Sequence, residues 1–292
     1  MEYRVRHRTT YRYLQDVAQS CHLAHLMLRE TPLQAVQASH VSLSPEAASR
    51  AARRDWFGNE CEWFFFNAPH DHLEVVAESL VTVEPAPARD AAASITWEEV
   101  RALLEAPPDA ETRDAVQYLF DSPMTGFTAD LAAYALESFT PDRPLLEGAM
   151  ELMHRIHDDF RYDTTVTDTA TAVDTVFEIR AGVCQDLAHV AIAALRSIGL
   201  PARYVSGYLL TRPPPGMPRM LGADASHAWF SVFAPPFGWV DLDPTNDVPV
   251  GEGHVTAAWG RDYGDVAPVG GIILGGHGHV IEVGVDVIPA EE

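Results

Sequence analysis

A cysteine stands directly before an apolar helix in the second half of the chain. The segment Ala181-Gly-Val-Cys-Gln-Asp-Leu-Ala-His189 carries Cys184, and the alanine-rich run from Leu187 to Ile198 predicts a helix that stops at Gly199-Leu-Pro201. The unpaired N–H groups and the dipole at a helix N-terminus favour an anion, so a cysteine placed there is held as the nucleophilic thiolate. Taken alone, the segment is more typical of a small buried core cysteine.

Two further polar residues lie at the ends of expected strands. His227 opens a strand that runs to Phe233, and Asp243 follows the strand Trp239 to Leu242, directly before Pro244. Sixteen residues separate His227 from Asp243, which is enough for two adjacent antiparallel strands and a tight connection. A thiolate nucleophile needs a base within hydrogen-bond reach, and that base needs an acceptor on its other nitrogen. We therefore predict that Cys184, His227 and Asp243 meet as a catalytic triad.

Other residues near these three have alternative roles. Asp241 shares its strand face with Asp243 and is a rival for the task of orienting the histidine. Trp229 and Trp239 are predicted to bind substrate, with a place in the core as the alternative for both. The backbone N–H of Cys184 is the one oxyanion donor that the sequence suggests. No H-E-x-x-H motif or thiolate pair indicates a metal site, and no cofactor is expected.

The elements that must position these side chains fall into two parts. The first thirteen residues alternate apolar and polar side chains with period two, and further strand-like runs follow as far as Val83. We predict an α+β protein with a β-sandwich-like domain over residues 1–85, a proline-containing linker over 86–95 and a helical segment with a catalytic core over 96–292. Thr96-Trp-Glu-Glu99 has the spacing of a capping box and marks the first helix.

Composition excludes some classes of function. A formal charge of −22 repels phosphate backbones, which argues against nucleic-acid binding, and no apolar run has the length of a membrane helix. Three cysteines are too few for a disulfide framework and favour a reducing compartment, so we expect a cytoplasmic protein with no membrane partner. All 20 basic residues are arginine, so the chain has no lysine side chain to which it could link itself.

Longer stretches resemble a known family. The run from Arg180 to Tyr208 is similar to the nucleophile segment of the bacterial transglutaminase-like superfamily, and the run from His227 to Asn246 resembles its histidine and aspartate segments. The N-terminal Y-R-V-R-H-R-T-T-Y-R-Y resembles the β-domain that often precedes this core. The resemblance implies a papain/transglutaminase-like core and a papain-like mechanism, in which the thiolate attacks an amide carbonyl and a thioester forms. The glutamine that papain-type enzymes carry six residues before the nucleophile is missing here.

Three functions follow from this resemblance. A peptidase or amidase would hydrolyse the thioester, and a transamidase would pass the acyl group to an amine. A non-catalytic scaffold on the same core is the third, but such proteins usually lose a triad residue, and this chain keeps all three. We favour hydrolysis of peptide or isopeptide bonds, with a peptide or protein as the substrate. The sequence leaves the oligomeric state open.

Overall fold

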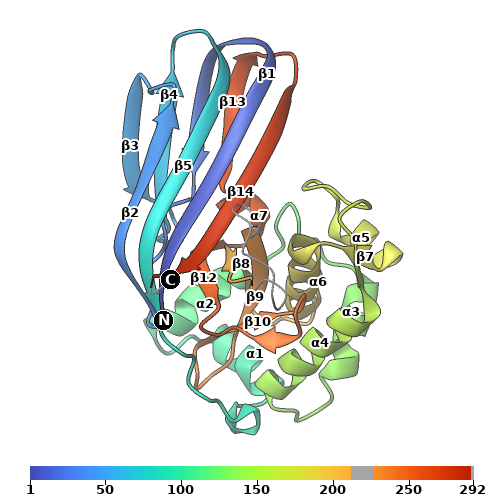
Figure 1. Cartoon of the computed structure of the whole chain (residues 1–292). Coiled ribbons are helices and arrows are strands. Elements are labelled where there is room, and N and C mark those ends of the chain that lie inside the picture. Colours follow the sequence, from blue (N-terminus) through green and yellow to red (C-terminus); the bar gives the residue numbers. More distant parts are fainter. Residues whose placement is uncertain (212–225, 291–292) are drawn as a thin grey trace, which may run out of the picture.

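The computed structural model describes residues 1–211 and 226–290, and it confirms an α+β architecture. Long strands form a curled sheet that stands beside a core of helices packed on a smaller sheet (Figure 1). The first and last described residues lie close together near the base of the curled sheet, where the Ala290 N–H donates to the Glu2 carbonyl at 2.9 Å. Within the described residues, no helix is both long and apolar enough to cross a membrane.

The first sheet has seven strands arranged around the 23-residue strand β1. One half of β1 pairs with β5 and β14, and the other half pairs with β4 and β13. Alternate side chains of β1 are buried, which is the period-two pattern seen in the sequence. The sheet curls over its own apolar cluster, and this gives the β-domain its sandwich-like packing. The strands are β1 (Glu2–Ala24), β2 (Gln34–Ser44), β3 (Ser49–Arg54), β4 (Glu60–Phe66), β5 (His70–Val83), β13 (Val269–Gly275) and β14 (His279–Pro289).

The end of the chain returns to this first sheet. We predicted that residues 96–292 belong to the helical and catalytic part, but β13 and β14 pair with β1 along almost its whole length. Alternation in residues 280–288 predicts a strand without saying which sheet it joins. The long β1 leaves an edge that its sequence neighbours do not cover, and the returning hairpin satisfies the hydrogen bonds of that edge.

The core consists of a five-stranded antiparallel sheet, in the order β11-β10-β9-β8-β12, with helices packed against it. Its strands are β8 (Ala202–Leu209), β9 (Ser226–Phe233), β10 (Trp239–Asp243), β11 (Val248–Pro249) and β12 (His254–Gly260), and a separate short pair is formed by β6 (Arg161–Tyr162) and β7 (Ala181–Gly182). The helices are α1 (Trp97–Glu105), α2 (Ala110–Ala115), α3 (Ala129–Ser138), α4 (Leu145–Asp159), α5 (Val173–Ile179), α6 (Cys184–Ser197) and α7 (Tyr263–Val266), with 3-10 turns at η1 (Ala91–Ala93) and η2 (Val116–Leu119).

Helix α6 is the central helix of the core. Most of its residues from Gln185 to Arg196 are buried, and its apolar side chains pack on Phe230 and Val232 of β9. Gly199 ends the helix with φ +80°, a conformation in which only glycine is unstrained. The capping box predicted at Thr96 is also confirmed, because Thr96 and Glu99 exchange hydrogen bonds at the start of α1.

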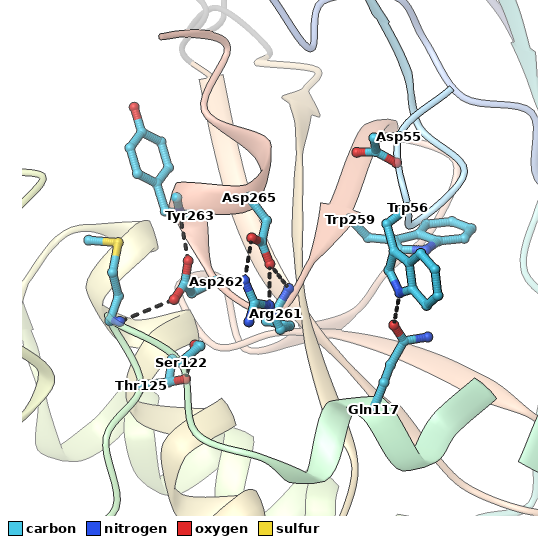
Figure 2. Close-up of polar contacts among 12 residues, drawn as sticks. Asp55, Trp56, Gln117, Ser122, Thr125, Trp259, Arg261, Asp262, Tyr263 and Asp265 are labelled. Atoms are coloured by element: carbon cyan, nitrogen blue, oxygen red, sulfur yellow. Dashed lines mark hydrogen bonds and ion pairs between the residues drawn. The ribbon is translucent and has the colours of Figure 1, made fainter. Parts of the chain in front are cut away.

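The two parts are joined by apolar packing and by specific polar contacts. Tyr3 and Val5 of β1 share a buried cluster with Tyr208 of β8 and Val255 of β12. Asn59 clamps the backbone of Trp259 in β12, accepting from its N–H at 3.0 Å and donating to its carbonyl at 2.8 Å. Figure 2 shows this junction, where the exposed Trp56 donates from Nε1 to Gln117 at 2.8 Å. The β-domain and the core therefore form a continuous packed unit.

Candidate active site

Cys184 is the first residue of α6, and the backbone in front of it is held in place. The Asp186 carboxylate accepts the N–H of Val183 at 2.8 Å and the hydroxyl of Thr167 at 2.7 Å. A Cβ on Gly182 would lie 2.5 Å from the same carboxylate, so only glycine fits there. The Cys184 side chain is partly exposed and carries a free thiol. The sulfur therefore combines a fixed position at the helix N-terminus with access for a reactant.

His227 lies between the sulfur and a buried carboxylate. Its Nε2 donates to Asp243 Oδ2 at 2.7 Å. The Cys184 side chain interacts with the same imidazole and raises its pKa. His227 is 9% exposed and Asp243 is fully buried. The structure thus brings together the three side chains that the sequence singled out, in the order sulfur, imidazole, carboxylate.

Asp243 accepts more hydrogen bonds than the histidine supplies. Its Oδ2 also accepts from Asn246 Nδ2 at 2.7 Å and from His254 Nε2 at 3.1 Å. Its Oδ1 accepts the backbone N–H groups of Thr245 at 2.9 Å and of Asn246 at 3.3 Å. A buried carboxylate with five donors is held ionised and in a fixed orientation.

Sequence analysis missed His254 and Asn246. Asn246 lies three residues after Asp243, and the turn that follows Pro244 was the one signal that could have drawn attention to it. His254 lies on β12, which is separated from β10 by β9 and β8 in the sheet. Its spacing in the sequence from the triad residues matches no motif that would have indicated a role. Its Nδ1 accepts the Gly251 N–H at 3.3 Å, so its Nε2 carries the proton that it donates to Asp243.

The electrostatics of the site favour a charged histidine. Burial lowers the pKa of His227, but its hydrogen bonds with Asp243 and Cys184 outweigh burial and raise that pKa to about 10. Burial raises the pKa of Asp243, but hydrogen bonds from His227 and His254 outweigh burial and hold it well below its usual range. At neutral pH the imidazole is therefore an imidazolium held between a carboxylate and the sulfur, which is the arrangement that stabilises a thiolate.

The two tryptophans take different places. Trp229 is fully buried, its ring lies 5.3 Å from that of His254 in an edge contact, and it covers Gly207, where a Cβ would come within 2.5 Å of the indole. Trp239 is partly exposed and lies against Phe233 and Tyr118. Trp229 thus packs against the rings of His227 and His254. A contact of Trp229 or Trp239 with substrate stays a prediction.

Asp241, the rival to Asp243, lies elsewhere. It is paired with Ser231 on β9 and lines a pocket that Cys184, His227 and Asp243 do not line. The carboxylate that bonds His227 is that of Asp243. The geometry therefore favours Asp243 as the orienting acid.

A tyrosine, Tyr162, lies close enough to Cys184 to be affected by its charge. Tyr162 of β6 is placed by the pairing of β6 with β7, opposite Gly182. Burial raises the pKa of Tyr162, and the negative charge of Cys184 raises it further. A neutral phenol is a hydrogen-bond donor, so Tyr162 is a second candidate oxyanion donor beside the backbone N–H of Cys184.

Three side chains of the site could also hold a metal ion. His227, Asp243 and His254 each offer one ligand atom, and these atoms lie within 4.8 Å of one another. Both imidazoles donate to the same Asp243 oxygen, so a cation would have to displace the two protons. The hydrogen bonds fit a carboxylate that orients histidines better than they fit a ligand set.

Fold and site together define a cysteine-dependent acyl-transfer protein. Two family profiles match the sequence, those of the bacterial transglutaminase-like N-terminal region over residues 3–82 and of the transglutaminase-like superfamily over residues 131–244. Protein Rv2569c of Mycobacterium tuberculosis is 41% identical over an alignment of 297 positions, which covers 99% of this chain and 93% of that protein. The chain belongs to the transglutaminase-like superfamily.

Two other similarities differ in extent. The protein-glutamine gamma-glutamyltransferase of Pseudomonas aeruginosa is 35% identical over 97 residues, which are 32% of this chain and 14% of that protein. The crystal structure of a candidate cysteine protease from Cytophaga hutchinsonii superimposes with a TM-score of 0.75 at 20% identity, covering 98% of this chain and 90% of that one. This second likeness establishes the shared fold across both parts of the molecule.

Proposed function

We propose that this protein hydrolyses peptide or isopeptide bonds, with Cys184 as nucleophile, His227 as base and acid, and Asp243 as the group that orients His227. The observation that carries the proposal is the single imidazole that donates to a fully buried carboxylate and whose pKa the Cys184 side chain raises. Such a histidine can exchange a proton with the reacting groups while keeping its orientation.

The proposed reaction has two halves. The Cys184 thiolate attacks the amide carbonyl carbon, and the backbone N–H at the start of α6 stabilises the oxyanion. The C–N bond breaks as His227 gives its proton to the leaving amine or ammonia, which leaves a thioester on the sulfur. His227 then removes a proton from water, the resulting hydroxide attacks the thioester, and the acid leaves as the thiolate is restored.

Transamidation is the second candidate function. It uses the same thioester, which a primary amine attacks in place of water. The similarity to the Pseudomonas aeruginosa protein-glutamine gamma-glutamyltransferase supports it, because that similarity covers a third of this chain. A scaffold without activity is less consistent with a site in which the nucleophile, the base and the acid are all present and hydrogen-bonded.

One assay separates these functions. Ammonia release from glutamine-containing peptides is measured with and without an added primary amine, together with cleavage of a peptide library. Cys184→Ser is the matched control, because it keeps the shape of the side chain and loses the thiolate. We expect release that depends on Cys184 and is dominated by hydrolysis. Incorporation of amine exceeding hydrolysis would favour transamidation, and equal activity in Cys184→Ser would refute the assignment. The chain has no lysine of its own to compete for the acyl group.

The cytoplasm stays our predicted compartment. Cys21, Cys61 and Cys184 are all free thiols, which is consistent with a reducing environment. A peptide or protein remains the proposed substrate class, without nucleic acid, cofactor or metal.

A further inference from the structure

A pocket of about 510 Å³ lies where the β-domain meets the core. The β-domain contributes residues 31–34 to its lining, and the start of the linker contributes others. The core contributes Trp239, Asp241 and Trp259. Neither Cys184 nor His227 lines it, although His254, which donates to Asp243, does. The pocket is therefore a separate hollow that adjoins the back of the site.

Its floor contains a buried arginine with an unmet hydrogen-bonding atom. Arg203 is 6% exposed and lines the pocket, and its Nε has no hydrogen-bond partner among the described residues. Ser231, directly opposite on β9, is fully buried and its Oγ also has no partner there. Asp241 continues this row on β10. A buried donor without an acceptor is costly, so a ligand that brings an acceptor to Arg203 would be bound favourably.

Two tryptophans hold this arginine in place. Its guanidinium carbon lies 3.8 Å from the ring centroid of Trp259 and 4.3 Å from that of Trp239. Trp259 is itself fixed, because Asn59 clamps its backbone and Arg29 lies 3.4 Å from its ring (Figure 2 shows Trp259 at the junction). Arg203 is thus preorganised, with a planar fork of donors suited to a carboxylate.

The charges around Arg203 restrict what can bind. Besides Arg203 and Arg89, the pocket is lined by four carboxylates, those of Glu84, Glu111, Asp114 and Asp241. Three of them act on Arg203 electrostatically, Asp241 most strongly. A simple anion would be repelled by these carboxylates and by the net charge of −22, and a simple cation would leave the donors of Arg203 without an acceptor. A ligand carrying both charges satisfies both sets of groups.

We propose that this pocket binds a zwitterion, a free amino acid or a short peptide, with its carboxylate on Arg203, its ammonium group facing Asp241 and its side chain against the aromatic wall. The motivating juxtaposition is Arg203, Ser231 and Asp241 in one row across three strands, beneath Trp239 and Trp259. This site is independent of the proposed catalytic function, because it uses none of the triad residues.

Binding is tested with glycyl-L-leucine on the full chain carrying Cys184→Ala, which prevents turnover of the probe. Isothermal titration calorimetry gives the Kd, and intrinsic fluorescence, to which Trp239 and Trp259 contribute among six tryptophans, is a second readout. We expect saturable binding of glycyl-L-leucine, and at least about tenfold weaker binding of its C-terminal amide and of its N-acetyl derivative, because each loses one charged partner. The absence of saturable binding up to about 10 mM, or equal binding of the dipeptide and its amide, would overturn the proposal.

Variants then locate the site. Arg203→Lys keeps the charge and loses the fork, and we expect it to weaken binding at least about fivefold, with a larger loss in Arg203→Met. The matched control is Arg53→Met, which removes an arginine that also stacks on a tryptophan, Trp63 at 4.8 Å, but lies outside the pocket. Circular dichroism shows which variants are folded. A folded Arg203→Lys with unchanged Kd would contradict the assignment, and if neither Arg203 variant folds, the comparison of the three probes still decides.

Discussion

Replacing Asp243 by asparagine changes one atom type at the centre of the site. The new Oδ1 still accepts the backbone N–H groups of Thr245 and Asn246. The new NH₂ group takes the place of Oδ2 and faces donors from His227, Asn246 and His254. His227 can bond this group only by making Nε2 an acceptor, which moves its proton to Nδ1, on the side of the sulfur. A neutral imidazole in that tautomer cannot take a proton at Nδ1.

The expected losses are large in both activity and stability. A triad histidine in the wrong tautomer typically costs roughly 1,000- to 10,000-fold in kcat. Asp243 is fully buried and its charge is paired with His227. Removing that charge leaves either an imidazolium without a counter-charge or a neutral imidazole that has lost its hydrogen-bond acceptor. Breaking such a buried pair costs about 3–5 kcal/mol in the free energy of unfolding.

The stability loss depends on pH in a defined direction. Hydrogen bonds from His227 and His254 lower the pKa of Asp243, although burial opposes them. The stabilisation by this carboxylate is therefore present above its unfolded pKa of about 4 and is lost as pH falls towards its folded value. Urea unfolding monitored at pH 7 and again near pH 3 should show a large gap between wild type and Asp243→Asn at pH 7, and a smaller gap in acid.

The assay is kcat/KM for thiol-dependent amide cleavage, with urea unfolding on the same preparations. Asp121→Asn is the control, because Asp121 is exposed and the same chemical change there should leave both quantities within experimental error. Activity of Asp243→Asn within about tenfold of wild type would refute the orienting role. A stability gap that does not narrow in acid would refute the electrostatic account of Asp243.

Two further predictions concern neighbouring groups. His254→Ala should lower kcat about tenfold with little change in KM, and His254→Gln should recover part of the loss, because its amide can donate to Asp243 in place of Nε2; equal kcat in His254→Ala and wild type would show that His254 has no positioning role. A maleimide probe read out by peptide mass spectrometry should label Cys184 well before Cys61, since Cys61 is buried and burial raises the pKa of its thiol; labelling of both at the same rate would mark Cys184 as an ordinary cysteine.

Local sequence patterns predicted much of this structure. The nucleophile at the start of an apolar helix, the capping box at Thr96 and the alternation in β1 each depend on residues that are near in sequence, and each element forms. The family segments also supplied the order of Cys184, His227 and Asp243. These features follow from helix capping and from period-two burial.

Long-range pairing could not be predicted in the same way. The return of β13 and β14 to β1 joins residues more than 240 positions apart, and their alternation is compatible with either sheet. His254 reaches Asp243 only because β12 and β10 lie in the same sheet, and Arg203 acquires its tryptophan neighbours from β10 and β12. Such partners depend on strand order, which the spacing of residues in one sequence does not determine.

The pH dependence of Cys184 alkylation tests the central claim without any knowledge of the substrate. The second-order rate constant with iodoacetamide is measured from about pH 4 to pH 10 in a Cys21→Ser/Cys61→Ser background, in which Cys184 is the sole cysteine of the 292 residues. His227, whose pKa is raised to about 10, should sustain rapid alkylation well below the pH at which a free thiol ionises, about 8.5. In His227→Ala the rate should follow that of a free thiol. Identical profiles with and without His227 would contradict the claim that sulfur, imidazole and carboxylate act as one unit.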